Sequence, residues 1–275
     1  MQLPIHQIDA FADRTFTGNP AAVVELPQWL PDSILQAIAA ENNLSETAFL
    51  VREVPADVDD SIDIGPAYHL RWFTPAEEVE LCGHATLAAA HLLLSGEHAG
   101  ADLVKFWTLS GWLLVRGHEG AYTMEFPTDS IRPLPVPEGL ADALGTAVLE
   151  TWQGRRDLLC VVSDSATLQS LTPDLTALRQ VGRPVIVTAP GEGNTDFVSR
   201  FFAPTLGVPE DPVTGSAHTT LTPYWAERLD RTDLTAQQLS ARPGTLRCVL
   251  HADRVEISGS AVTYLTGSIE VETKV

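Results

Sequence analysis

The feature that most constrains this chain is a phrase that occurs twice. In the first copy, Arg71-Trp72-Phe73-Thr74-Pro75 leads through a short spacer to Gly83-His84-Ala85. In the second copy, Arg200-Phe201-Phe202-Ala203-Pro204 leads in the same way to Gly215-Ser216-Ala217. An acidic residue stands near the end of each spacer, and an apolar, helix-compatible stretch follows each glycine. This internal repeat predicts a chain built from two related halves.

Length and composition agree with two globular domains. The chain has 275 residues, of which 44% are hydrophobic, enough to bury sizeable cores. It contains no apolar stretch long enough to span a bilayer and no secretory signal at its N-terminus, so we expect a soluble, cytoplasmic protein. The formal net charge of −19 disfavours nucleic acid and anionic membranes as partners. An anionic substrate would therefore need a locally positive site.

Cysteine usage and nucleotide motifs exclude several kinds of site. Cys82, Cys160 and Cys248 are odd in number, far apart, and lack CxxC or Cys/His ligand spacing. The sequence therefore predicts neither a disulfide framework nor a metal site. It also lacks a GxGxxG motif after a strand and a GxxxxGK[ST] motif, so no nucleotide cofactor is expected.

Apolar periodicity predicts an α+β chain whose strands form mixed or antiparallel sheets. We expect helices over residues 33–42 and 85–94, the second of them buried because it is apolar all round. A further helix is expected over 168–179, and the helix after Gly215 should kink or break at Pro223. The chain should close with short strands at 246–250, 254–258 and 262–265. The proline-rich segment 127–137 is the expected linker between domains 1–128 and 129–275.

The two glycine-started helices are candidate anion sites. The first N–H groups of a helix lack intrahelical partners, and the helix dipole leaves partial positive charge there. Gly83 and Ala85 in the first copy, and Gly215 and Ala217 in the second, are therefore candidate substrate-binding residues. The alternative is that each glycine only makes a turn before a core helix. Finding the phrase twice, with polar His84 and Ser216 at matching places, favours the site.

Titratable side chains near these points are candidates for proton transfer. Glu46 heads a predicted buried strand, where desolvation raises the pKa of a carboxyl toward that of a general acid and base, although it could be an ordinary loop residue. Asp211 could orient His84 or accept a proton, or simply belong to a turn. His84 could shuttle protons or be structural, and Ser216 could bind ligand or cap its helix. Cys82 beside a helix start could be a reactive thiol or a small buried residue.

Four groups of residues, spread over essentially the full length, carry a resemblance to a known family. They are Gly18–Val24, Asn43–Phe49, Arg71–Pro75 with Leu81–Thr86, and Arg200–Pro204 with Glu210–His218. In these segments the chain resembles the PhzF family, the phenazine-biosynthesis type of isomerases, which has the diaminopimelate epimerase-like fold.

The resemblance implies two pseudo-symmetric domains, each a mostly antiparallel sheet curled around a central helix, with the active site in the cleft between them. The last strand is a candidate to return to the first domain, as in related folds. Family members are usually homodimers and need no cofactor. Their acid and base maps onto Glu46, and their supporting residues map onto His84, Asp211 and Ser216. Asn19, in a matching segment, is a further candidate substrate-binding residue. One departure concerns related epimerases, which use a cysteine from each half: Cys82 stands at the first place, but Thr214 stands at the second.

The sequence therefore predicts a cofactor-independent isomerase that moves a proton between carbons of a small anionic, carboxylate-bearing metabolite. One alternative is an epimerase or racemase that uses Glu46, Asp211 or Cys82 on opposite faces of one carbon. Another is a non-catalytic small-molecule-binding protein of the same fold. The motifs describe proton transfer and carboxylate binding, and they do not specify the substrate.

Overall fold

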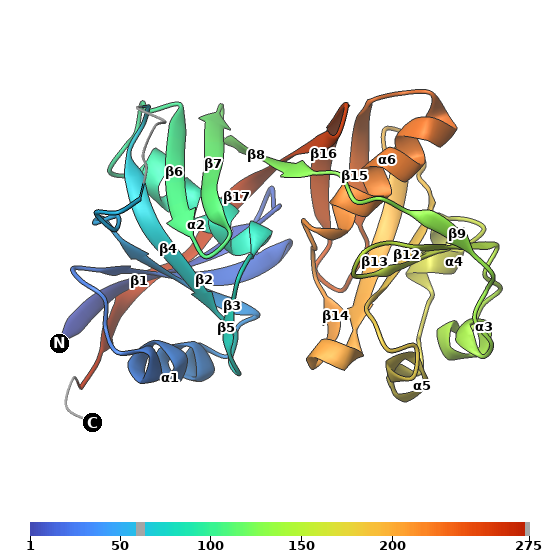
Figure 1. The fold of residues 1–275 in the computed structure, drawn as a ribbon, viewed down its shortest axis with the longest axis horizontal. Coiled ribbons are helices and arrows are strands. Elements are labelled where there is room, and N and C mark those ends of the chain that lie inside the picture. The colour runs from blue at the N-terminus through green and yellow to red at the C-terminus, as the bar shows by residue number, and fades with distance from the viewer. Residues whose placement is uncertain (59–63, 273–275) are drawn as a thin grey trace. The chain divides into compact units, whose positions relative to one another are not determined.

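The computed structural model describes residues 1–58 and 64–272 and divides into two compact units (Figure 1). Unit 1 comprises Met1–Met124 and Gly259–Val275, and unit 2 comprises Glu125–Ser258. The division falls within strand β8 (Ala121–Pro127) and again within strand β17 (Arg254–Glu270). Each of these two strands therefore contributes residues to both units.

Unit 1 is a mixed sheet with two helices. Its further elements are β1 (Gln2–Ala10), β2 (Asn19–Leu26), α1 (Asp32–Asn42), β3 (Glu46–Val51), β4 (Ala67–Phe73), β5 (Glu78–Val79), α2 (Gly83–Ser95), β6 (Leu103–Thr108) and β7 (Gly111–His118). The hydrogen-bonded order is β17, β1, β2, β3, β4, β6, β7, β8, with β5 also paired to β4. Among the strand pairs of this order in the described residues, β2–β3 and β4–β6 are parallel and the others are antiparallel, so the sheet is mostly antiparallel.

The curled sheet of unit 1 encloses α2, which contacts β1, β2, β3, β6 and β7 (Figure 1). This contact on several sides explains why the helix is apolar all round, and it confirms the buried helix predicted over 85–94. In contrast, α1 buries one face, formed by Ile34, Leu35, Ile38 and Ala39, against β3 and β4. Because β3 contacts both helices, every residue of this strand after Glu46 is buried.

Unit 2 repeats this arrangement. Its further elements are β9 (Arg132–Leu134), α3 (Leu140–Leu144), β10 (Glu150–Gln153), β11 (Leu158–Val161), α4 (Ser165–Gln169), α5 (Leu175–Arg179), β12 (Val185–Pro190), β13 (Phe197–Ala203), η1 (Pro204–Leu206), β14 (Val208–Asp211), α6 (Ala217–Leu229), β15 (Asp233–Gln238) and β16 (Gly244–His251). The order is β9, β10, β11, β12, β13, β15, β16, β17, with β14 on β13. The parallel pairs, β11–β12 and β13–β15, occupy the same places as in unit 1, and α6 corresponds to α2.

The fold is therefore α+β, with two similar units that each place a helix against a mostly antiparallel sheet. The duplicated phrase marks equivalent elements: β4, β5 and α2 in the first copy, and β13, β14 and α6 in the second. Within the part of the chain that the structure describes, none of the helices is both long and apolar enough to cross a membrane.

Four local expectations differ from the structure. The helix expected over 168–179 is two short helices, α4 and α5, because Pro173 between them removes a helix donor and restricts the residue before it. The closing strands expected at 254–258 and 262–265 are one continuous strand, β17. Part of the expected linker forms β9, which pairs with β10. Of the kink or break expected at Pro223, the break does not occur: α6 continues through this residue, since burial of Leu221, Tyr224 and Trp225 outweighs one missing hydrogen bond.

Candidate active site

Glu46 begins β3, where the chain leaves α1 through the left-handed residue Asn43. The parallel neighbour of Glu46 on β2 is Ala21, two residues after Asn19. The Glu46 side chain is 19% exposed, so it lies at the boundary between the apolar interior and solvent. Its Oε2 atom lies 3.2 Å from Nε2 of His84. The structure thus brings together a strand start and a helix start that are distant in sequence.

His84 is the second residue of α2 and is 6% exposed. Burial lowers the pKa of its imidazole to about 3, so the ring is neutral at physiological pH. Its Nδ1 atom lies 3.2 Å from Nδ2 of Asn19, a fully buried amide. With the amide nitrogen as donor, Nδ1 accepts, and Nε2 carries the ring hydrogen. Asn19 therefore orients the proton of His84.

Cys82 adds a thiol to this cluster. It is the N-cap residue of α2, is 6% exposed, and places Sγ 3.5 Å from Nδ1 of His84. The donor atoms of Glu46, Cys82 and His84 all lie within 4.8 Å of one another, which makes them a possible metal-ligand set. The sequence contained no ligand spacing that could have predicted this set, because Glu46 reaches it from β3 whereas Cys82 and His84 lie at the start of α2.

The start of α2 offers backbone donors. Thr86 makes the first intrahelical bond, from its N–H to the carbonyl of Cys82 at 3.1 Å. The N–H groups of Gly83, His84 and Ala85 precede that bond, and no side chain described in the structure caps the helix. Partial positive charge therefore remains beside the imidazole and the carboxylate.

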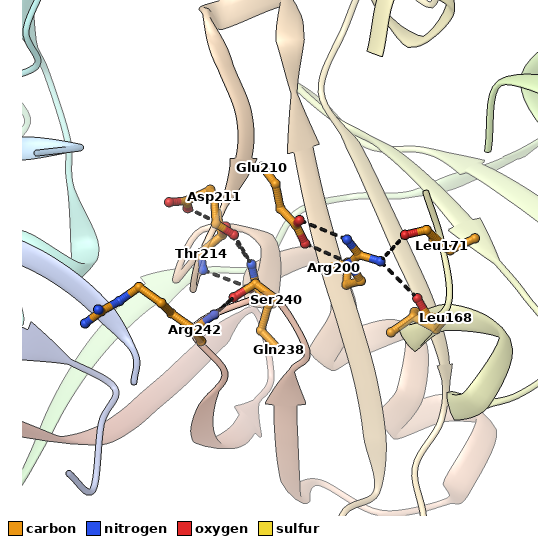
Figure 2. Close-up of polar contacts among 9 residues, drawn as sticks. All are labelled: Leu168, Leu171, Arg200, Glu210, Asp211, Thr214, Gln238, Ser240 and Arg242. Carbon is orange, nitrogen blue, oxygen red and sulfur yellow. Dashed lines mark hydrogen bonds and ion pairs between the residues drawn. The ribbon is translucent and has the colours of Figure 1, made fainter. Parts of the chain in front are cut away.

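In unit 2, Asp211 ends β14 and is held by a short network (Figure 2). Its carboxylate accepts a hydrogen bond from the hydroxyl of Thr214. Gln238 donates from Nε2 to the carbonyl of Asp211 at 2.7 Å, and its Oε1 accepts from the N–H of Thr214 at 2.9 Å. Sequence reasoning missed Gln238, because nothing distinguishes a glutamine at the end of a strand. Thr214, the counterpart of Cys82, thus serves to orient Asp211.

The start of α6 resembles that of α2 but carries different side chains. Ser216 is exposed, and its side chain does not cap the helix within the described residues. His218 is fully buried, and its Nδ1 lies 2.8 Å from the carbonyl oxygen of Thr214. Because a carbonyl oxygen can only accept, Nδ1 is the donor of this hydrogen bond. Burial lowers the pKa of His218 to about 4, so this ring is also neutral. Its contact with the Thr214 carbonyl indicates a structural role.

The arginine of each repeated phrase forms a two-pronged ion pair. Arg71 donates from Nε and Nη2 to the carboxylate of Glu78, both at 2.7 Å. Arg200 donates to Glu210 at 2.7 and 2.9 Å, and also to the carbonyl groups of Leu168 and Leu171 (Figure 2). These pairs tie the strand carrying the arginine to the short strand that precedes the helix. The Arg71–Glu78 and Arg200–Glu210 pairs therefore stabilise the strand pairs that lead to α2 and α6.

The sequence-predicted residues fall into two sets. In unit 1, the structure brings Asn19, Glu46, His84 and the helix start at Gly83 and Ala85 together from three separate segments. In unit 2, the predicted residues lie along one segment; they are Asp211, Gly215, Ser216 and Ala217. A carboxylate beside a neutral imidazole and free helix amides can accept a proton and stabilise a neighbouring anion.

Comparison with known proteins agrees with this architecture. The chain matches the PhzC-PhzF family, described as phenazine biosynthesis-like, over residues 8–267. An uncharacterized isomerase of Pseudomonas aeruginosa is 49% identical over 272 residues, which cover 98% of this chain and 100% of that relative. A phenazine biosynthesis protein of the PhzF family from Enterococcus faecalis has a crystal structure with a TM-score of 0.92 at 44% identity, covering 98% and 100% of the two chains.

A more distant structure shares the fold alone. A hydroxyproline epimerase from Agrobacterium vitis has a TM-score of 0.58 at 10% identity, covering 98% of this chain and 92% of that one. Since the family match spans most of the chain and the relatives align over their full lengths, this chain belongs to the PhzC-PhzF family of phenazine biosynthesis-like proteins, whose members include isomerases.

Proposed function

We propose that this protein is an isomerase that moves a proton between two carbons of a small, carboxylate-bearing metabolite, with Glu46 as the acid and base. The observation that supports this most is the 3.2 Å approach of Glu46 Oε2 to Nε2 of the buried, neutral His84. A neutral imidazole orients a carboxylate without neutralising it by proton transfer. Glu46 then takes a proton from one carbon and returns it to another.

The start of α2 supplies the complementary electrophilic groups. Removal of the proton leaves negative charge that spreads toward the carboxylate of the substrate. The N–H groups at Gly83 and Ala85, together with the helix dipole, are suited to hold that charge, and such a donor is worth about 3 kcal/mol. All of these groups belong to the protein, so the proposed step uses no cofactor.

We assign the second set of residues to the same reaction. Asp211 is oriented by Thr214 and Gln238, and the exposed Ser216 hydroxyl lies at the uncapped start of α6. In this proposal, Ser216 and the amides of Gly215 and Ala217 bind an oxygen of the substrate. Asp211 accepts a hydrogen bond from a polar group of the substrate. Asp211→Asn and Ser216→Ala should therefore raise KM or lower kcat. Ser216→Ala, at an exposed position, should do so without changing the thermal unfolding temperature.

Glu46→Gln tests the central assignment. A panel of amino acids and unsaturated carboxylates is incubated with enzyme in deuterated water, and isotope incorporation is followed by NMR. Loss of a general base should slow exchange at least about 100-fold, while circular dichroism remains that of the folded protein. The matched control is Glu41→Gln, an exposed carboxylate near the end of α1, which should exchange at the wild-type rate. Undiminished turnover by Glu46→Gln on the same substrate would remove Glu46 from the role.

An epimerase is the second candidate, because Cys82 presents a thiol beside His84. An epimerase would incorporate deuterium at the α-carbon with loss of optical rotation, and Cys82→Ser would abolish that reaction. The proposed isomerase would instead shift a double bond and tolerate Cys82→Ser. Thr214 favours the isomerase, since a threonine hydroxyl bonded to Asp211 stands where a second thiol would be needed.

A further inference from the structure

We propose that Glu46, Cys82 and His84 form a binding site for a borderline transition-metal ion of the Zn²⁺ class, and that the bound ion inhibits the enzyme. The inhibition rests on the proposed catalytic role of Glu46, whereas the binding does not. The supporting observation is the convergence of three different ligand types whose donor atoms all lie within 4.8 Å of one another.

One donor atom from each residue lies within 4.8 Å of the other two, so side-chain rotation has to bring them to the spacing of a tetrahedral ion. Bond lengths of roughly 2.0–2.3 Å place neighbouring ligand atoms of a tetrahedral zinc site about 3.3–3.7 Å apart. In the structure, Cys82 Sγ lies 3.5 Å from one imidazole nitrogen, and Glu46 Oε2 lies 3.2 Å from the other. The imidazole coordinates through one of these nitrogens, and side-chain rotation closes the remaining gap. Three protein ligands leave the fourth position for water or a substrate carboxylate.

The chemical state of each group also suits a cation. Metal binding converts the Cys82 thiol to a thiolate and releases its proton to solvent. An imidazole nitrogen and a carboxylate oxygen complete a ligand set of the kind that Zn²⁺ binds. One thiolate and one carboxylate then balance a divalent charge within a largely buried cluster.

Asn19 supplies a partner for the second imidazole nitrogen. Its amide lies beside Nδ1 and can present oxygen instead of nitrogen when the ion occupies Nε2. Hydrogen bonds of this kind orient metal-bound histidines. An ion held in this way occupies the Glu46 oxygen that would accept the substrate proton, so turnover and metal binding exclude each other.

Cobalt(II) provides a direct test, because its bond to a thiolate absorbs in the near ultraviolet whether or not the enzyme turns over. Metal-free, reduced wild-type protein titrated with Co²⁺ should develop this band with one equivalent bound. Cys82→Ser should lose the band, and Glu46→Gln and His84→Asn should raise the Kd for Co²⁺ at least about tenfold. The matched control is Cys248→Ser, a buried thiol in β16, which should keep both the band and the affinity.

Zinc inhibition supplies the second readout. Zn²⁺ should stop isotope exchange by the wild type, and a chelator should restore it. For Cys82→Ser, the Zn²⁺ concentration that halves its own metal-free exchange rate should be at least about tenfold higher than for the wild type. If Co²⁺ produces no thiolate band in wild type, or if Cys82→Ser keeps the band, the proposed metal site is wrong. This conclusion holds even if Glu46→Gln abolishes turnover. A thiolate band combined with undiminished exchange by Glu46→Gln would retain the metal site and overturn the proposed function.

Discussion

At the residue scale, the carboxyl of Asp157 makes stability depend on pH, because its surroundings disfavour its charged form. Asp157 is buried in unit 2. Burial raises the pKa of its carboxyl from 3.8 to about 6, and the nearby negative charge of Asp129 adds to this effect. Because the folded pKa exceeds the unfolded one, this group favours folding below about pH 4, and that contribution is lost as the pH rises through 6.

Asp157→Asn should therefore stabilise the protein at alkaline pH. We expect the free energy of unfolding to rise by up to about 3 kcal/mol at pH 8, and by little at pH 4, where the wild-type carboxyl is largely protonated. Urea unfolding of both proteins at the two pH values measures the difference. An equal change at both values would assign the effect to packing instead of ionisation.

At the element scale, the Arg200–Glu210 pair joins β13 to β14 and also holds the carbonyl groups of Leu168 and Leu171 at the α4 end. The two side chains are 11% and 23% exposed, so solvent screens this pair less than a surface pair. Lysine keeps the charge but cannot make the two-pronged contact.

Arg200→Lys should therefore lower the free energy of unfolding by about 1–3 kcal/mol. The control is Arg254→Lys, because Arg254 pairs with Glu125 where the side chains are 44% and 37% exposed, and its change should stay within about 0.5 kcal/mol. Chemical unfolding of the wild type and of both variants measures the two changes in the free energy of unfolding. Equal losses would mean that burial of the pair contributes nothing.

At the scale of the whole molecule, the last strand of the chain completes the first unit. Residues of β17 after Ser258 pair with β1 from Ala10↔Ala261 to Gln2↔Glu270. Without them, β1 would pair only with β2 in the described sheet. Unpaired backbone groups on a long strand are costly and promote association between chains.

A chain ending at Ser258 should therefore lose protection in unit 1 selectively. Hydrogen exchange read by mass spectrometry should show faster exchange in β1 and its neighbours, while peptides from the core of unit 2, such as β12 and β13, stay protected. A chain ending at Val271, directly after β17, is the control and should exchange like the full-length protein. Loss of protection spread evenly over both units would contradict the prediction that these residues stabilise unit 1 selectively.

Much of the fold and family followed from local sequence patterns. The doubled phrase, the apolar helix after Gly83 and the alternating strands are determined by neighbouring residues, because periodicity and backbone preference act over a few positions. The same patterns failed where a distant pairing or one residue decided the outcome. Pro173 divided the helix expected over 168–179, and pairing with β1 joined the last two expected strands into β17.

The sequence by itself determined two similar halves, their α+β character, the family resemblance and the residue types suited to proton transfer. Only the tertiary structure decided which of those residues meet. It placed Glu46 and Asn19 against His84, and Gln238 against the backbone of Asp211 and Thr214. The physical reason is that these contacts join segments far apart in the chain, so they depend on strand pairing and helix burial.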